Sequence, residues 1–129
     1  MPAASIDRKR AAVHDGAMLV YKILRRPEWD AFHAAGTTAG APIDLIDGYI
    51  HLSTAAQVAE TAARHFATES DLVLLALDDA ALGPALKWEA SRGGQLFPHL
   101  YRPLTSADVI WDKSLPLGAT GHIFPEGLW

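Results

Sequence analysis

Residues 48–54, Gly48-Tyr49-Ile50-His51-Leu52-Ser53-Thr54, run directly into a stripe of small apolar residues at Ala55–Phe66. The tyrosine, isoleucine and leucine of this stretch favour a β-strand. Thr54 is typical of the residue that caps the start of a helix. The stretch therefore predicts a short buried strand that delivers His51 and Ser53 to the N-terminus of a helix. An anionic or hydroxyl-rich ligand suits that position, because the first backbone amides of a helix have no partner within it.

The composition is that of one soluble globular domain. The chain has 129 residues, of which 50% are hydrophobic and 20% are charged, and this length is enough to build a core. The longest apolar run, Leu72–Leu77, is far shorter than the roughly 20 residues that span a membrane. We therefore expect one domain over residues 18–129, preceded by a flexible extension over residues 1–17, and no membrane partner.

Charge and cysteine content narrow the classes of partner and the location. The net charge is −4, there is no cysteine, and the only basic run is at residues 8–10. A surface that binds a nucleic acid duplex needs a larger basic patch, so a small molecule or a nucleotide is the partner that we expect. The lack of cysteine is compatible with a reducing cytoplasm, which is the expected location.

Apolar periodicity and turn signals predict an α+β fold, with two or three helices packed on a twisted mixed or antiparallel sheet. Pro98 favours an edge strand or the start of a strand, whereas the continuous apolar run at Leu72–Leu77 predicts a central strand. Gly40 and Pro42 indicate that residues 37–47 form a loop. The expected strands are 18–24, 49–52, 72–77, 86–89, 97–101 and 107–111; the expected helices run from Pro27 to before Gly36 and over 55–67.

Three polar clusters interrupt this apolar pattern. The first is His51 with Ser53 and Thr54. A histidine in a strand needs a partner for each ring nitrogen, so a structural role and a functional role are both open. The adjacent helix start favours the functional one.

The second cluster is Lys87-Trp88-Glu89-Ala90-Ser91-Arg92-Gly93-Gly94. Its charges fit a solvated salt-bridge network of little energetic weight. They equally fit a site in which Glu89 acts as a general base or holds a ribose hydroxyl, with Arg92 nearby.

The third cluster is Phe97-Pro98-His99-Leu100-Tyr101. Its rings fit a small satellite core, and they also fit a surface that stacks on a planar ligand ring. Metal binding by His51, His65, His99 and Glu89 is a further alternative, but no two histidines have a close metal-binding spacing. We expect no metal.

Several motifs together resemble the bacterial DUF952 family, over about residues 18–125. They are Tyr21-Lys22-Ile23-Leu24, Glu28-Trp29, Asp47-Gly48-Tyr49-Ile50-His51-Leu52-Ser53-Thr54, Asp71-Leu72-Val73-Leu74-Leu75, Leu86-Lys87-Trp88-Glu89, Ser91-Arg92-Gly93-Gly94 and Phe97-Pro98-His99-Leu100-Tyr101. This family is similar at the superfamily level to the ADP-ribosyltransferase fold, which binds NAD in a cleft between two small sheets. The resemblance thus implies an ADP-ribosyltransferase-like architecture and NAD as the cofactor.

Residue by residue, the resemblance places His51-Leu52-Ser53 on the strand motif that holds the adenosine ribose and the nicotinamide amide, with Leu52 where that fold has glycine. His51 and Glu89 are then the expected catalytic residues. The expected cofactor-binding residues are His51, Ser53, Thr54, Arg92, His99 and Tyr101. The implied reaction breaks the nicotinamide–ribose bond through an oxocarbenium-like centre, with a carboxylate stabilising the positive charge.

Three functions follow as alternatives. The first is an ADP-ribosyltransferase-like or NAD-glycohydrolase-like enzyme, or a degenerate relative of one, and it requires His51 and Glu89 to open onto one cavity. The second is a non-catalytic nucleotide or small-molecule binding module, which requires only the cavity. The third is a histidine-dependent metal hydrolase, which requires three ligands to converge.

Overall fold

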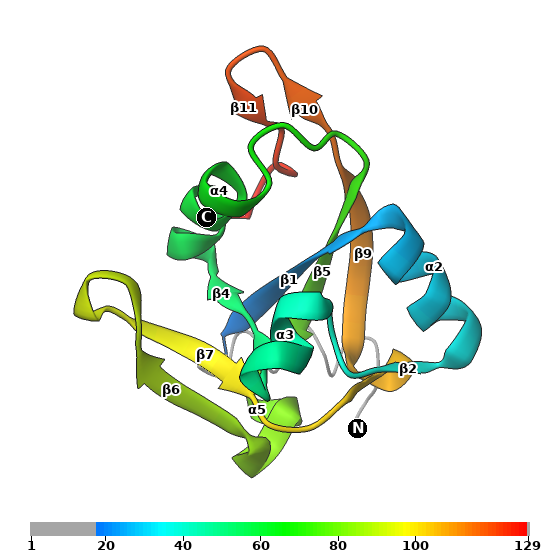
Figure 1. Cartoon of the computed structure of the whole chain (residues 1–129), viewed down its shortest axis with the longest axis vertical. Coiled ribbons are helices and arrows are strands. Elements are labelled where there is room, and N and C mark those ends of the chain that lie inside the picture. Colours follow the sequence, from blue (N-terminus) through cyan, green and yellow to red (C-terminus); the bar gives the residue numbers. More distant parts are fainter. Residues whose placement is uncertain (1–17, 129) are drawn as a thin grey trace.

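The computed structural model describes residues 18–128, apart from the side chain of Arg92. The extension predicted over residues 1–17 lies outside the described residues. Within them, a four-stranded antiparallel sheet has the order β4-β1-β5-β9 (Figure 1). Its strands are β1 (Leu19–Arg25), β4 (Ser53–Thr54), β5 (Leu72–Asp78) and β9 (Val109–Leu115).

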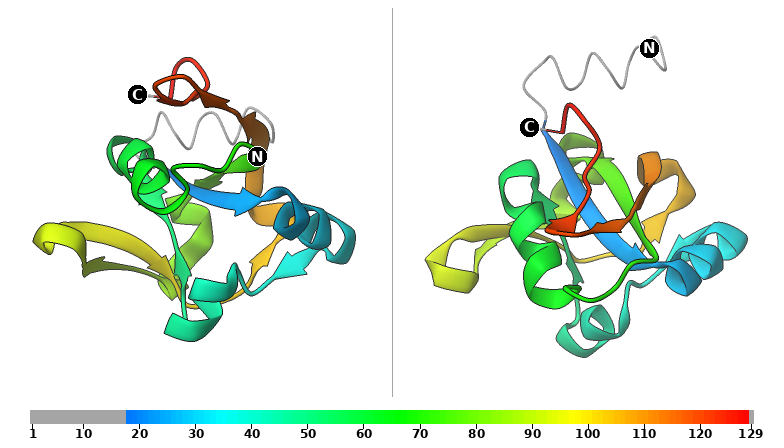
Figure 2. Two further views of the ribbon diagram at one scale, coloured as in Figure 1. Left: turned by 45° about the horizontal axis from the view of Figure 1, so that its top comes forward. Right: turned by 90° about the horizontal axis from the view of Figure 1, so that it is seen from above.

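A second antiparallel sheet has the order β3-β7-β6, and its β6–β7 hairpin projects to one side of the molecule (Figures 1 and 2). Its strands are β3 (Ile50–His51), β6 (Leu86–Ala90) and β7 (Leu96–Leu100). Two small ladders complete the strands: β2 (Thr37–Thr38) with β8 (Leu104–Thr105), and β10 (Leu117–Gly118) with β11 (Gly121–His122).

Four α-helices lie within residues 18–128: α2 (Arg26–Ala35), α3 (Pro42–Asp47), α4 (Ala55–His65) and α5 (Asp79–Leu82). Short 3-10 segments are η1 (Gly83–Ala85), η2 (Arg92–Gly94) and η3 (Ser106–Asp108). The α+β class is confirmed, the sheets are antiparallel rather than mixed, and there is at least one helix more than expected.

The strand β5 is central, as its apolar run predicts. It lies between β1 and β9, and all seven of its residues are buried. Alternate side chains enter two different cores, because successive residues of a strand face opposite sides of the sheet. Leu75 joins the core that contains Phe32 of α2, while Leu74 joins the one that contains Val58 of α4.

The helix α2 has the start and stop signals that its sequence suggests. The Arg25 amide donates to the Glu28 carboxylate at 2.8 Å, and Pro27 lies in the first turn. Gly36 ends the helix with φ 79°, a left-handed conformation that glycine adopts without strain. The amphipathic helix predicted from Ala55 is confirmed as α4, with Thr54 as its N-cap residue.

The strand predicted over residues 49–52 is in fact the point where the chain changes sheets. His51 belongs to β3 and pairs with His99 of β7, whereas Ser53 belongs to β4 and pairs with Tyr21 of β1. Leu52 lies between them and is buried. The crossing brings the two sheets together beside His51.

Two further expectations are wrong. The predicted loop at residues 37–47 contains β2 and α3. The strand with Pro98 is the middle strand of its sheet, not an edge, and Pro98 is its third residue, not its first. The carbonyl of Pro98 accepts from the Leu52 amide at 3.0 Å, and the amide and carbonyl of one strand residue face the same side. The missing proline N–H therefore faces Leu52, just beyond the end of β3, and not β6. Only the reciprocal bond to the Leu52 carbonyl is absent, and the pairing of β7 with β6 loses none.

Candidate functional site

A cavity of about 860 Å³ lies where β1, α3, the β3–β4 crossing, α4 and β7 meet. Both sheets and the helices α2, α3 and α4 contribute residues to its lining. Among the lining residues are Lys22, Glu28, Asp47, His51, Ser53, Thr61, Phe97 and His99. A volume of this size is within the range of small-molecule sites, which is about 300–1,000 Å³.

His51 is held by two carboxylates of α3. Its Nδ1 lies 2.6 Å from Asp44 Oδ1, and its Nε2 lies 2.9 Å from Asp47 Oδ2. The His51 backbone amide also donates to Asp44 at 3.0 Å. The side chain of His51 is 34% exposed, whereas that of Asp44 is fully buried. Each ring nitrogen of His51 thus lies within hydrogen-bond distance of a carboxylate oxygen, and the two contacts hold the ring in one orientation.

Asp44 is the centre of this network. Its Oδ2 accepts from the Ala41 amide at 2.8 Å and pairs with Lys22 Nζ at 2.7 Å. Burial alone would raise the pKa of Asp44, but the hydrogen bond from His51 and the charge of Lys22 outweigh it and lower that pKa to about 2. The carboxylate is therefore ionised at neutral pH.

Lys22 is a buried cation that lines the cavity, with only 6% of its side chain exposed. Besides its pair with Asp44, its Nζ donates to the His51 carbonyl at 3.2 Å. Burial lowers the pKa of Lys22, and the charge of Asp44 opposes that effect. The lysine thus fixes both ends of the Asp44–His51 unit.

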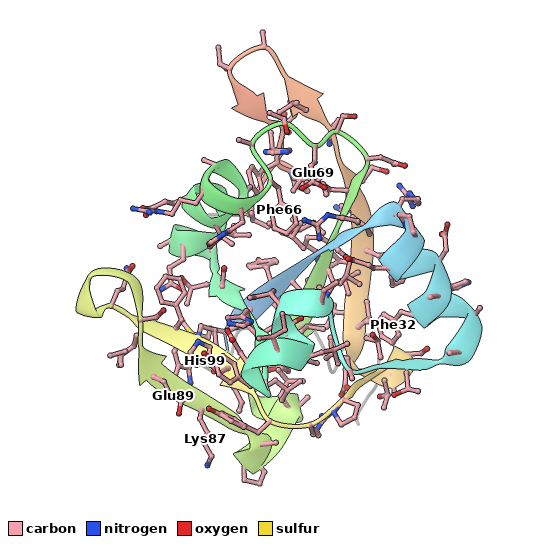
Figure 3. The ribbon with its side chains drawn as sticks, viewed as in Figure 1. Phe32, Phe66, Glu69, Lys87, Glu89 and His99 are labelled. Atoms are coloured by element: carbon pink, nitrogen blue, oxygen red, sulfur yellow. The ribbon has the colours of Figure 1, made fainter. Side chains whose placement is uncertain are left out.

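Glu89 and His99 form a second carboxylate–histidine pair on the β6–β7 hairpin (Figure 3). His99 Nδ1 lies 2.7 Å from Glu89 Oε1, and the Tyr101 hydroxyl donates to the same oxygen at 2.7 Å. The hydrogen bonds from Tyr101 and then His99 lower the pKa of Glu89, and the bond to Glu89 raises the pKa of Tyr101 to about 12. Tyr49 stacks on His99 with ring centroids 4.2 Å apart.

Ser53 lines the same cavity from the other side of the crossing. Its hydroxyl lies 2.9 Å from the Thr61 hydroxyl of α4, which also donates to the Gln57 carbonyl at 3.1 Å. Ser53 is buried. Ser53 and Thr61 thus place a pair of adjacent hydroxyls in the lining of the cavity.

The structure brings some of the expected site residues together and leaves others apart. His51, Ser53 and His99 line the cavity. Thr54, Glu89 and Tyr101 are not among its lining residues, and Glu89 reaches it only through its hydrogen bond to His99. The side chain of Arg92 lies outside the described part of the chain, so its predicted role stays a prediction.

Lys22, Asp44 and Asp47 are members of the site that the sequence reasoning did not include. Lys22 lies inside the apolar strand at residues 19–24, and this position indicates a buried acidic partner, because buried charges in proteins are paired. The segment around Asp44 contains a second signal, which indicates a short helix. Pro42 and Asp44 are typical of a helix start, and Gly48 is typical of a residue just after a helix end.

The metal alternative has no ligand set in the described residues. No group of three or more histidine, aspartate or glutamate side chains there is placed to hold a metal ion. In the same part of the chain, no helix has the length and apolar character needed to cross a membrane.

Comparison with known proteins identifies the family. The sequence model described as "Protein of unknown function (DUF952)" matches residues 23–112. Because this match covers more than half of the 129 residues, the chain belongs to the DUF952 family. No curated protein matches.

Solved structures of protein CC0527 from Caulobacter crescentus are similar to this chain. An X-ray structure has 54% sequence identity and a TM-score of 0.78, and it covers 81% of this chain and 91% of that chain. A crystal structure of a double mutant has 53% identity, a TM-score of 0.77 and the same coverage. A solution NMR structure has 54% identity and a TM-score of 0.73, covering 81% of this chain and 90% of that one.

Proposed function

We propose that this protein binds an NAD-class nucleotide in the cavity, with His51 and Ser53 in contact with the ligand. The observation that carries this proposal is the shared position of these two side chains. They belong to strands of different sheets, yet both line one cavity of about 860 Å³. The ADP-ribosyltransferase fold, which the sequence motifs suggest, also binds NAD in a cleft between two small sheets, and this supports the proposal.

The lining suits the parts of such a ligand. Phe97 and His99 offer ring faces to a planar base or nicotinamide. Asp47, His51 and the Ser53–Thr61 hydroxyl pair offer hydrogen-bonding groups to ribose hydroxyls. Asp44 holds the ring of His51 in place before a ligand binds. Binding therefore has a smaller entropy cost, because this side chain does not have to be ordered.

A second candidate is cleavage of the nicotinamide–ribose bond, and the position of Asp47 favours it. The proposed reaction needs a carboxylate beside the positive charge that develops on the ribose. Asp47 lines the cavity and touches His51 Nε2, whereas Glu89 does not line it. Asp47 therefore takes the electrostatic role that the sequence assigns to Glu89.

A thermal-shift titration of the purified protein tests the binding proposal. NAD, ADP-ribose and nicotinamide are each added to the wild type, to His51→Ala and to a control variant, His33→Ala. His33 is exposed on α2 and does not line the cavity. A ligand that binds only the folded state raises the melting temperature, with about 2.7 kcal/mol of stabilisation at 100 times Kd.

We expect NAD or ADP-ribose to raise the melting temperature of the wild type and of His33→Ala, and to raise that of His51→Ala much less. Release of nicotinamide on incubation with NAD separates the enzyme from the binding module. The proposal is wrong if neither nucleotide shifts the wild type, or if His51→Ala responds as strongly as the control.

A further inference from the structure

The Glu89–His99 pair has the arrangement of a proton acceptor held in place by a carboxylate. The side chain of His99 is only 5% exposed, yet it lines the cavity. Glu89 Oε1 accepts from Nδ1, which keeps the proton on that nitrogen and leaves the lone pair on Nε2. Within residues 18–128, no other hydrogen bond to the ring of His99 is found.

The two histidines of the cavity therefore differ in what they can do. Both ring nitrogens of His51 lie against carboxylates, so neither is free to take a proton from a ligand or from water. Among the described residues, the ring of His99 has a hydrogen-bond partner at Nδ1 alone. The rings are close, with centroids 5.6 Å apart, so a molecule bound against His51 is within reach of His99.

We propose that His99 is the general base of the cavity and that Glu89 is its positioning residue. This inference rests on the proposed function, including cleavage of the nicotinamide–ribose bond. A water molecule forms a new bond from its oxygen to ribose C1′ and gives its proton to His99 Nε2. The bond from C1′ to the pyridinium nitrogen breaks, and its electron pair leaves with nicotinamide, which becomes neutral. His99 then passes the proton to solvent, so NAD and water yield ADP-ribose, nicotinamide and one proton.

The surroundings of His99 keep its ring in one orientation. Tyr49 stacks on one face, and Leu100 and Phe97, its neighbours on β7, are buried. The charged or titratable groups around His99 come from three strands or their ends. They are Glu89 and Lys87 from β6, of which Lys87 is directly opposite His99 in the β6–β7 ladder, Tyr101 after β7, and Tyr49 and His51 at β3. Glu89 is the group among them that is hydrogen-bonded to the ring.

The test measures nicotinamide release from NAD by the full chain, with the wild type, His99→Ala, Glu89→Gln and the His33→Ala control. Loss of a general base lowers kcat by about 10²- to 10⁴-fold. We expect that loss in His99→Ala, with KM changed little and part of the rate restored by added imidazole. Glu89→Gln loses less. The wild-type rate falls at low pH as the base becomes protonated, and His99→Ala lacks that fall.

The outcomes separate this inference from the function on which it rests. Wild-type release with full activity in His99→Ala overturns the role of His99 and leaves the enzyme intact. Binding of NAD without nicotinamide release overturns the role of His99 and leaves a binding module. A wild type that does not bind NAD removes both proposals. If circular dichroism shows that His99→Ala is unfolded, the test uses Glu89→Gln instead, because Glu89 is partly exposed and its replacement is expected to leave the fold intact. A rate and pH profile of Glu89→Gln equal to those of the wild type then overturns the inference.

Discussion

The carboxylate of Asp44 accepts from the amides of Ala41 and His51, binds the imidazole of His51 and pairs with Lys22. The contacts with Ala41 and Lys22 are buried, and those with His51 are partly buried. At the scale of single residues, this carboxylate connects the stability of the fold to the geometry of the candidate site. It fixes a buried lysine and a cavity histidine with the same two oxygens.

Replacing Asp44 with asparagine removes the negative charge and leaves the Lys22 cation buried without a counter-charge. Breaking a buried pair in this way costs about 3–5 kcal/mol. We expect Asp44→Asn to lower the free energy of unfolding by that amount in urea denaturation. Asp112→Asn, at an exposed position on β9, is the matched control and is expected to change it by less than about 0.5 kcal/mol. Equal stabilities of the two variants would contradict this account of the network.

The same residue predicts how stability depends on pH. The pKa of Asp44 is about 2 in the folded protein against an ordinary 3.8, so folding favours the ionised carboxylate. Its contribution is present above about pH 4 and is lost as the pH falls toward 2; the pKa difference corresponds to about 2 kcal/mol. The stability gap between the wild type and Asp44→Asn is therefore expected to narrow by about that amount between pH 5 and pH 2. A constant gap would show that Asp44 is not the group responsible.

At the scale of elements, the short helix α3 carries both carboxylates that hold His51. It is bounded by two glycines with positive φ, Gly40 at 109° and Gly48 at 88°. A Cβ on Gly40 would overlap the side chain of Asp44, whereas a Cβ on Gly48 would meet nothing within 4 Å. Substitution of either glycine would therefore strain the backbone, but only substitution of Gly40 would disturb Asp44 and the site.

This difference gives a paired experiment. Alanine at either glycine forces a left-handed conformation on a residue with a Cβ, which costs about 1–2 kcal/mol. We expect Gly48→Ala to show only this loss of stability and to keep its affinity for NAD. Gly40→Ala is expected to lose more stability, and its affinity for NAD is expected to fall because Asp44 is displaced from His51. Urea denaturation and calorimetric titration measure the two effects, and identical behaviour of the variants would refute the explanation.

The elements differ in how far the sequence predicts them. The strands β1 and β5 and the helices α2 and α4 follow from apolar periodicity and from residues such as Pro27 and Gly36. Helix α3 was missed because its apolar residues do not mark a buried face: Ile43, Leu45 and Ile46 are all exposed. Its start and stop residues are present, but the glycines and the proline around it favour a loop when they are considered alone.

At the scale of the whole molecule, the cavity depends on pairings between distant segments. The change of sheet at Leu52 separates His51 from Ser53, and nothing in a period-two pattern distinguishes one continuous strand from two short ones. The sequence places His51, Ser53 and His99 in a site, and the structure places all three at one cavity. The sequence does not show that Glu89 is hydrogen-bonded to His99, because that contact depends on the register of β6 against β7.

The central claim, that this cavity binds an NAD-class nucleotide, is tested most directly by two-dimensional ¹H–¹⁵N NMR of the labelled protein during titration with NAD. The account predicts shifts of the backbone amides of His51, Ser53, Phe97 and His99, and none around the smaller cavity of about 250 Å³ between α2 and β9, at His33, Ile110 and Trp111. An unchanged spectrum, or shifts confined to the smaller cavity, would contradict the claim.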